Sequence, residues 1–302
     1  MRRQSKSSSS NPWRWPPEGF ARGTAAAPGS WHPAGKHVDV GEHRLHVIDV
    51  GAGSSPPVLL LHGILVSSWA WRHTLSGLAS SRRLVAPCHP GHGFSSKKVR
   101  SYSIRELTRA AVGVLDHLGL DQVDIVGNSL GGGVALRMAL DHPDRVRRLV
   151  LVAPAAMPIP AFAPLLALQG THFGALYRTV LRERVIRGFL THRAYKQPIV
   201  DDEFMAKLWA PLASGETFVA AGIISRGLPA EMNELHEALP SIFKRTLVVW
   251  GDHDGLLSPS AAPTIVKRLP RAELKLFEAC GHCPMEEHPG AFNAMLTTFL
   301  DS

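Results

Sequence analysis

The segment of this sequence most able to carry chemistry is Gly-Asn-Ser-Leu-Gly at residues 127–131, called the elbow below. An apolar stretch of strand length precedes it, and an apolar stretch with helical spacing follows it. Gly-x-Ser-x-Gly between a strand and a helix puts the serine on a tight, strained turn, where the flanking glycines avoid a clash. The pattern therefore predicts a nucleophile at Ser129, in a turn formed by Gly127, Asn128 and Gly131.

Two other kinds of glycine-rich turn compete with this interpretation. A phosphate-binding loop needs Gly-Lys-Ser or Gly-Lys-Thr, and the elbow has no lysine. A dinucleotide fingerprint needs Gly-x-Gly-x-x-Gly, and the elbow does not have that spacing. A plain structural turn stays open until a partner for the serine is found.

That partner must be a base, because a serine hydroxyl is a poor nucleophile until its proton is removed. The order expected for a serine in such a turn is serine, then acid, then histidine. Downstream of Ser129, one apolar stretch ends in Asp252-His253-Asp254 and the next is followed by His282. Carboxyl ends of parallel strands lie at one edge of a sheet. We therefore expect His282 to be the base and one of the two aspartates to orient it.

The elements that would position these groups alternate between strands and helices. The expected strands are residues 38–40, 45–50, 57–62, 84–87, 123–126, 148–153, 246–250 and 273–277. The expected helices are residues 69–80, 104–118, 130–141, 261–269 and 290–300. The first two strands are predicted to form a hairpin at one edge. The alternation implies right-handed crossovers and an α/β fold with a mostly parallel, doubly wound sheet.

The alternation stops between residues 154 and 240, where helical stretches rich in apolar and aromatic residues replace it. We expect a core domain of residues 37–153 and 241–302, with residues 154–240 as a helical cap over the site. Most of the cap's large apolar side chains should pack between helices, and some should line an apolar pocket. A basic run in the cap is either a solvated helix face or supplies a partner for a substrate carboxylate: Arg182, Arg184, Arg187 and Arg193.

The formal net charge of +8 raises the question of nucleic-acid binding. Residues 1–36 hold +5 of it, which leaves +3 for the rest of the chain, and no basic cluster is interleaved with aromatics. Nucleic acid is therefore not an expected partner. The first 36 residues are rich in proline and serine, which predicts a flexible basic tail.

Cysteine usage and hydropathy bear on location. Three cysteines are too few for a disulfide scaffold, which favours a reducing compartment, and we expect the cytoplasm. No run of eighteen apolar residues occurs, so no membrane span is expected. Cys280-Gly281-His282-Cys283 looks like a redox dithiol, but such a motif opens a long helix, and Pro284 follows at once here. Redox chemistry is not expected, although a disulfide that deforms this loop stays open.

Taken together, these motifs resemble the α/β-hydrolase superfamily over roughly residues 37–301. The resemblance rests on four separated motifs in the family's order: His62-Gly63; Pro90-Gly91-His92-Gly93-x-Ser95; the elbow; and Gly251-x-x-Asp254 followed by Gly281-His282. It implies that Asp254, three residues after Gly251, is the acid, and that Asp252 is a turn residue. It also implies an oxyanion hole made by the backbone N–H groups of Ile64 and Leu130, and neither a metal nor an organic cofactor.

The resemblance also narrows the reaction. Related dehalogenases and epoxide hydrolases use an aspartate at the elbow, so Ser129 favours acyl transfer and a carboxylesterase or lipase-like enzyme acting on esters of small hydrophobic molecules. The alternative is a hydrolase of carbon–carbon bonds in meta-cleavage products, whose elbow is similar but whose Gly-Pro-Gly after the His-Gly is replaced here by Ile64-Leu65-Val66. A slow-turnover ligand receptor that kept the fold is a third hypothesis. The sequence does not indicate an oligomeric state.

Overall fold

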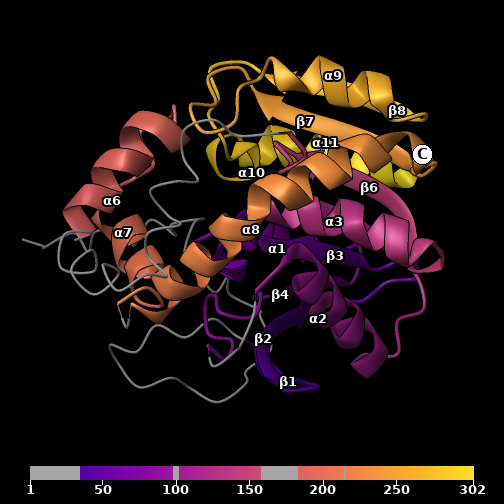
Figure 1. The fold of residues 1–302 in the computed structure, drawn as a ribbon, viewed down its shortest axis with the longest axis horizontal. Helices are drawn as coiled ribbons and strands as arrows, with labels where there is room; N and C mark the ends of the chain where they lie inside the picture. The colour runs from indigo at the N-terminus through magenta and orange to yellow at the C-terminus, as the bar shows by residue number, and fades with distance from the viewer. Residues whose placement is uncertain (1–34, 98–101, 158–182, 214) are drawn as a thin grey trace, which may run out of the picture.

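The computed structural model describes residues 35–97, 102–157, 183–213 and 215–302. Its centre is an eight-stranded sheet with the order β1-β2-β4-β3-β5-β6-β7-β8 (Figure 1). The strands are β1 (Lys36–Val40), β2 (His43–Val50), β3 (Val58–Leu61), β4 (Leu84–Pro87), β5 (Val123–Asn128), β6 (Val146–Val152), β7 (Arg245–Gly251) and β8 (Ala272–Phe277).

Strand direction divides the sheet into two parts. β1 pairs with β2, and β2 with β4, in antiparallel fashion, which makes the hairpin at one edge. From β4 through β3, β5, β6 and β7 to β8 every pairing is parallel. The predicted α/β fold with a mostly parallel sheet is therefore confirmed, and the carboxyl ends of β3, β5, β6, β7 and β8 meet at one edge.

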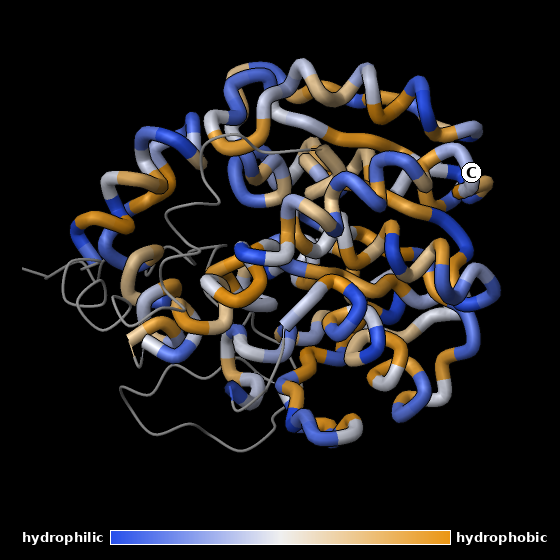
Figure 2. The backbone as a smooth tube through the Cα atoms, in the orientation of Figure 1, coloured by the Kyte–Doolittle hydropathy of each residue, from blue (hydrophilic) through white to orange (hydrophobic). Residues whose placement is uncertain are grey.

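Helices cover both faces of the sheet. The core helices are α1 (Arg72–Leu78), α2 (Ile104–His117), α3 (Leu130–Asp141), α9 (Ala261–Arg268), α10 (Pro284–Glu287) and α11 (Pro289–Asp301). Alternate residues of each strand point to opposite faces. In β3, Leu59 and Leu61 pack with α2, α3 and α9, whereas Val58 and Leu60 pack with α1 and α11. Figure 2 accordingly shows hydrophobic stretches along the central strands and hydrophilic ones on outer helical turns.

The expected helix at residues 69–80 is divided in two. A 3₁₀ helix, η1 (Ser68–Trp71), precedes α1, and the Ser67 hydroxyl accepts a hydrogen bond from the Trp69 N–H to cap it. All residues of η1 are buried. Short 3₁₀ turns are common at the N-termini of α-helices, and η1 is such a turn directly before α1.

The chain between β6 and β7 is helical where the structure describes it. It contains α6 (Glu183–Phe189), a π-helical turn η4 (Leu190–Ala194), α7 (Asp202–Trp209) and α8 (Glu216–Ala238). In Figure 1, α6 and α7 lie to one side of the sheet, and α8 runs from them back across α3. Short 3₁₀ helices η2 (Pro143–Arg145) and η5 (Leu239–Ser241) precede β6 and β7.

Some expectations fall outside the described residues. The predicted flexible tail, residues 1–36, falls almost entirely within residues 1–34, which are not described. Part of the expected cap, residues 158–182 and 214, is likewise not described. Within the described ranges, no helix is both long enough and apolar enough to cross a membrane.

Candidate active site

Ser129 lies between the end of β5 and the start of α3. Its backbone has φ 55° and ψ −116°, a conformation that L-residues rarely adopt. The turn is held by hydrogen bonds: the Ser129 N–H donates to the Val152 carbonyl at 2.9 Å, and the Ser129 carbonyl accepts from the Ala155 N–H at 2.9 Å. The strain is thus fixed by the neighbouring strand β6. The predicted strand–turn–helix at the elbow is what the structure contains.

The glycines of the elbow have no room for a side chain. A Cβ atom at Gly127 would lie 2.3 Å from the Gly131 carbonyl oxygen, and one at Gly131 would lie 2.2 Å from the Leu61 carbonyl oxygen. Both obstacles are backbone atoms, which cannot rotate away. This explains why the motif needs glycine two residues before and two residues after the serine.

A first prediction follows from this packing. Gly131→Ala should destabilise the protein by about 1–3 kcal/mol or more, because the added methyl group overlaps the end of β3. Gly188→Ala is the matched control, since nothing lies within 4 Å of a Cβ there and alanine favours the helix α6 by up to about 1 kcal/mol. Urea denaturation of both variants measures the difference. Equal stability of the two variants would contradict the packing described.

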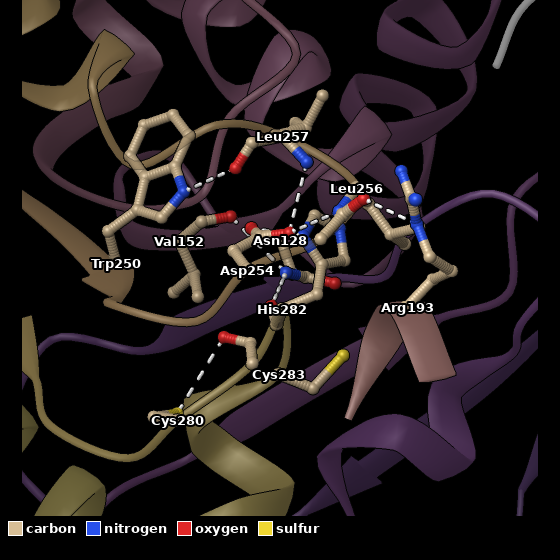
Figure 3. Close-up of polar contacts among 12 residues, drawn as sticks. Asn128, Val152, Arg193, Trp250, Asp254, Leu256, Leu257, Cys280, His282 and Cys283 are labelled. Atoms are coloured by element: carbon tan, nitrogen blue, oxygen red, sulfur yellow. Dashed lines mark hydrogen bonds and ion pairs between the residues drawn. The ribbon is translucent and has the colours of Figure 1, made fainter. Parts of the chain in front are cut away.

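His282 and Asp254 form a buried pair at the carboxyl ends of β7 and β8 (Figure 3). His282 Nδ1 lies 2.7 Å from Asp254 Oδ2. The other carboxylate oxygen, Oδ1, accepts hydrogen bonds from the N–H groups of Leu256 at 2.8 Å and Leu257 at 3.0 Å. Both carboxylate oxygens of Asp254 therefore have hydrogen-bond partners, which hold the carboxylate in one orientation toward the imidazole.

The second aspartate of this loop faces elsewhere. Asp252 accepts hydrogen bonds from the His253 ring at 2.6 Å and from the Cys280 N–H at 3.1 Å. The His253 side chain is half exposed. The structure thus brings Asp254, and not Asp252, to His282. Asp252 links the loop after β7 to Cys280, two residues before His282.

Asn128 joins the elbow to the loop that carries the histidine. Its amide nitrogen donates to the carbonyl of His282 at 3.3 Å and to the carbonyl of Val152 at 3.2 Å. Both bonds are buried, and a buried amide without partners would be unfavourable. Asn128 therefore ties the turn that carries Ser129 to the loop that carries His282 (Figure 3).

The two residues predicted to supply oxyanion donors, Ile64 and Leu130, both line the cavity that contains Ser129. Leu130 is the first residue of α3, whose N-terminal N–H groups carry partial positive charge. Gly63 packs against Ser129, since a Cβ there would lie 3.3 Å from Ser129 Cβ. Leu65 has φ 63°, so the loop after β3 is strained where it borders the cavity.

His62, which precedes that loop, is a structural residue. Its Nδ1 donates to the Gly63 carbonyl at 2.7 Å, and its Nε2 accepts from the His89 N–H at 3.0 Å. Burial, with the nearby rings of His89 and His92, holds the pKa of His62 well below its usual range. With both nitrogens engaged and the ring neutral, His62 is not available as a base.

A cavity surrounds Ser129 and His282, and its lining is mostly apolar. The loops after β3 and β7 contribute residues to the lining, and so do the helices α6, η4, α7 and α8 between β6 and β7, among them Phe189, Leu190, Leu208 and Phe218. Among the described residues, the Ser129 hydroxyl has no hydrogen-bond partner within 3.5 Å. In enzymes without substrate the bond from nucleophile to base is often long and tightens on binding.

Cys280 and Cys283 flank the histidine as free, buried thiols. Burial and the carboxylate of Glu287 raise the pKa of Cys280, and burial and Glu286 raise that of Cys283. Because the thiolate is the reactive form, these surroundings oppose dithiol chemistry.

Two arginines of the predicted basic run are engaged away from the cavity, whereas Arg184 is exposed on α6. Arg187 pairs with Asp202 at 2.7 Å, and Arg193 donates to the Gly255 carbonyl at 3.1 Å. Arg182 lies outside the described residues. Within those ranges, no group of three or more His, Cys, Asp or Glu side chains is arranged to hold a metal ion.

Two buried acids beside the site were not found from the sequence. Glu286 and Glu287 follow Gly-His-Cys-Pro in the short helix α10. Glu286 pairs with Arg72 and accepts a hydrogen bond from the Tyr195 hydroxyl at 2.6 Å. The sequence signal that could have revealed them is a pair of acids four and five residues after the expected base. Acids that become buried at such a place need hydrogen-bond or ionic partners.

Comparison with known proteins agrees with this architecture. The family model for the alpha/beta hydrolase fold matches residues 56–289. The chain is 33% identical over 282 residues to 2-hydroxymuconate semialdehyde hydrolase of Pseudomonas sp. strain CF600, a match that covers 91% of this chain and 96% of that protein. It is 29% identical to 2-hydroxy-6-oxo-6-phenylhexa-2,4-dienoate hydrolase of Burkholderia cepacia, over 85% of this chain and 91% of that one. The solved structure of a meta-cleavage product hydrolase from Pseudomonas fluorescens IP01 is similar with a TM-score of 0.76 and 27% identity, over 88% of this chain and 97% of that chain. The chain is therefore a hydrolase that belongs to the α/β-hydrolase fold family.

Proposed function

We propose that the chain is a serine hydrolase, in which Ser129 attacks a carbonyl carbon, His282 is the base and Asp254 orients it. The observation that carries the proposal is the buried pair of His282 and Asp254, at 2.7 Å, in the same cavity as a strained serine at a helix N-terminus. This is the set of roles that acyl transfer needs: nucleophile, base and a group that orients the base.

The geometry supports a two-step reaction. His282 Nε2 takes the Ser129 proton as Oγ bonds to the carbonyl carbon, and the N–H groups of Ile64 and Leu130 hold the oxyanion. The bond to the leaving group then breaks, and His282 returns the proton to that group. Water attacks the acyl-enzyme in the second step by the same route and frees Ser129. Asp254 keeps the proton on Nδ1, so that Nε2 is free to accept.

For the bond that is cleaved, we propose a carbon–carbon bond in a vinylogous diketone of the meta-cleavage type. Both relatives described above are named for such compounds, and each match covers most of both chains. In this reaction the leaving group is a carbon that takes the proton from His282, and conjugation to a second carbonyl stabilises it as it departs. The main prediction from sequence, ester cleavage, thus takes second place.

Ester hydrolysis remains the second candidate because of the cavity. Its lining is mostly apolar, and the charged side chain among the described lining residues is Glu286, whose carboxylate Arg72 and Tyr195 already bind. Muconate and dienoate substrates carry a carboxylate, and burial of an unpaired carboxylate is strongly unfavourable. An ester of an apolar acid makes no such demand.

A side-by-side assay separates these reactions. The purified chain is given a 2-hydroxy-6-oxo-dienoate, followed by loss of its absorbance, and p-nitrophenyl esters of increasing chain length. We expect a higher kcat/KM for the dienoate, and a loss of about four to six orders of magnitude in kcat for either substrate class in Ser129→Ala. A higher value for the esters would assign the enzyme to ester cleavage. A single turnover that leaves a stable adduct would support the ligand receptor, and hydrolysis of neither class would contradict the proposal.

A further inference from the structure

The side chain of Glu287, which the reaction above does not use, is buried at 8% exposure next to the base loop, residues 280–283. Its Oε1 accepts hydrogen bonds from the N–H groups of Gly281 at 2.9 Å and Cys283 at 3.4 Å. Its Oε2 accepts from the N–H groups of Lys196 at 2.7 Å and Gln197 at 3.0 Å. One carboxylate thus holds backbone donors from two segments, one oxygen for each.

The second segment, residues 193–197, comprises the last two residues of the π-helical turn η4 and the three residues after it. It is called the cap connector below. It also contacts both loops of the acid–base pair directly. The Ala194 carbonyl accepts from the His282 N–H at 2.6 Å, and the Arg193 carbonyl accepts from the Gly255 N–H at 3.1 Å, next to Asp254. The connector therefore lies against the base loop on one side and the acid loop on the other.

The cap connector is also part of the cavity wall. Ala194 and Tyr195 line the cavity that contains Ser129. The Tyr195 hydroxyl donates to Glu286, the residue before Glu287, and Glu286 in turn pairs with Arg72. The two adjacent acids of α10 thus hold the connector from two directions, and the same segment borders the substrate and supports the base.

A carboxylate is the side chain that this arrangement requires. An ionised glutamate accepts hydrogen bonds at both oxygens, whereas glutamine has one oxygen and an NH₂ group that can only donate. At position 287 the NH₂ group would face either the amides of the base loop or those of the cap connector. One of the two segments would then lose its acceptor and meet a donor instead.

We infer that Glu287 is a positioning residue for His282, fixing the base loop against the cap connector through their backbone amides. The inference rests on the proposed role of His282 as base. It assigns to Glu287 an effect on the rate of attack by Ser129 and not on binding, because Glu287 does not line the described cavity.

The test uses a fluorophosphonate, which reacts with an activated serine whatever the natural substrate is. In the full-length protein, Glu287→Gln should lower the saturating rate constant of Ser129 labelling by about 10- to 100-fold, since displacement of a reacting group by about 1 Å has effects of this size. The half-saturating concentration should stay within about twofold, because Glu287 itself does not line the cavity and the bond of the Tyr195 hydroxyl to Glu286 still holds the lining part of the connector. Initial labelling rates are divided by the final stoichiometry of labelling, so that a smaller fraction of folded protein is not mistaken for a slower reaction.

A spectroscopic readout separates positioning from a loss of stability. The downfield ¹H NMR resonance of the His282 Nδ1–H, bonded to Asp254, should shift or broaden in Glu287→Gln. Glu278→Gln is the matched control: Glu278 is exposed, lies directly after β8, and makes no hydrogen bond to residues 280–283. This variant should leave the rate and the resonance unchanged. Should the glutamine variant not fold, Glu287→Asp carries the test: it keeps the charge, is one methylene too short to reach both segments, and should show a smaller loss of rate.

The possible results are distinct. Wild-type rates and resonance in both Glu287 variants would overturn the inference while leaving the proposed function intact. Failure of the wild-type protein itself to label at Ser129 would instead refute the proposed function. A higher half-saturating concentration of the fluorophosphonate, with the saturating rate constant unchanged, would assign Glu287 to binding and also overturn the inference.

Discussion

Ser129→Ala is expected to lower kcat by about four to six orders of magnitude, with a Tm close to that of the unmodified protein. Alanine removes the only atom that can form the acyl-enzyme, and the remaining rate comes from water attack helped by the oxyanion donors. The fold should tolerate the change, because the Ser129 hydroxyl has no hydrogen-bond partner among the described residues. Steady-state kinetics with the better of the two substrate classes, and thermal denaturation, measure the two effects.

Ser225→Ala provides a control from the same cavity, since Ser225 is a second serine in the lining. Ser225 lies within the helix α8 and not on a strained strand-to-helix turn, so its loss should alter kcat by no more than about threefold, as for most substitutions away from a reacting group. Retention of full activity by Ser129→Ala, or a comparable loss in Ser225→Ala, would contradict the assigned nucleophile.

Asp254→Asn should lower kcat by about 10⁴-fold, as loss of the acid does in a serine protease. The reason lies in the partners of the carboxylate. Leu256 and Leu257 donate N–H groups to Oδ1, so an asparagine would keep its oxygen there and turn its NH₂ group toward His282 Nδ1. The imidazole would then accept at Nδ1 and hold its proton at Nε2, where it cannot take the proton of Ser129.

Asp252→Asn is the matched control, with the same change two residues away in the same loop. Its carboxylate contacts His253 and the Cys280 N–H, so a modest loss through the loop is expected, about tenfold or less. Kinetics of the two variants at one pH give the ratio. A larger loss in Asp252→Asn than in Asp254→Asn would reverse the assignment of the acid.

The parts of this site that the sequence predicts are those with a local signal. Gly127 and Gly131 mark the elbow because a Cβ at either would overlap backbone atoms. Ser129 and Asp254 follow the buried apolar strands β5 and β7, and His282 follows the edge strand β8, which is mostly exposed. Parallel strands bring their carboxyl ends together however far apart they lie in the chain. The sheet could be predicted for the same reason, since buried parallel strands are continuous apolar runs.

The parts that the sequence does not predict depend on contacts across the fold. Glu287 binds backbone N–H groups of Lys196 and Gln197, and an amide donor has no residue type that could reveal it. The division between η1 and α1 is likewise not predicted, because the spacing of apolar residues does not distinguish one 3₁₀ turn from the first turn of an α-helix. The choice between carbon–carbon and ester bonds depends on the cap, where helical spacing indicates packing but not which side chains face the substrate.

The most direct test of the central claim is labelling of the purified protein with a fluorophosphonate, followed by mass spectrometry of its peptides. The proposed roles predict one adduct, on Ser129, that is absent in Ser129→Ala and forms much more slowly in Asp254→Asn. An adduct on any other residue, or no adduct on a folded protein, would contradict the assignment of Ser129 as the nucleophile.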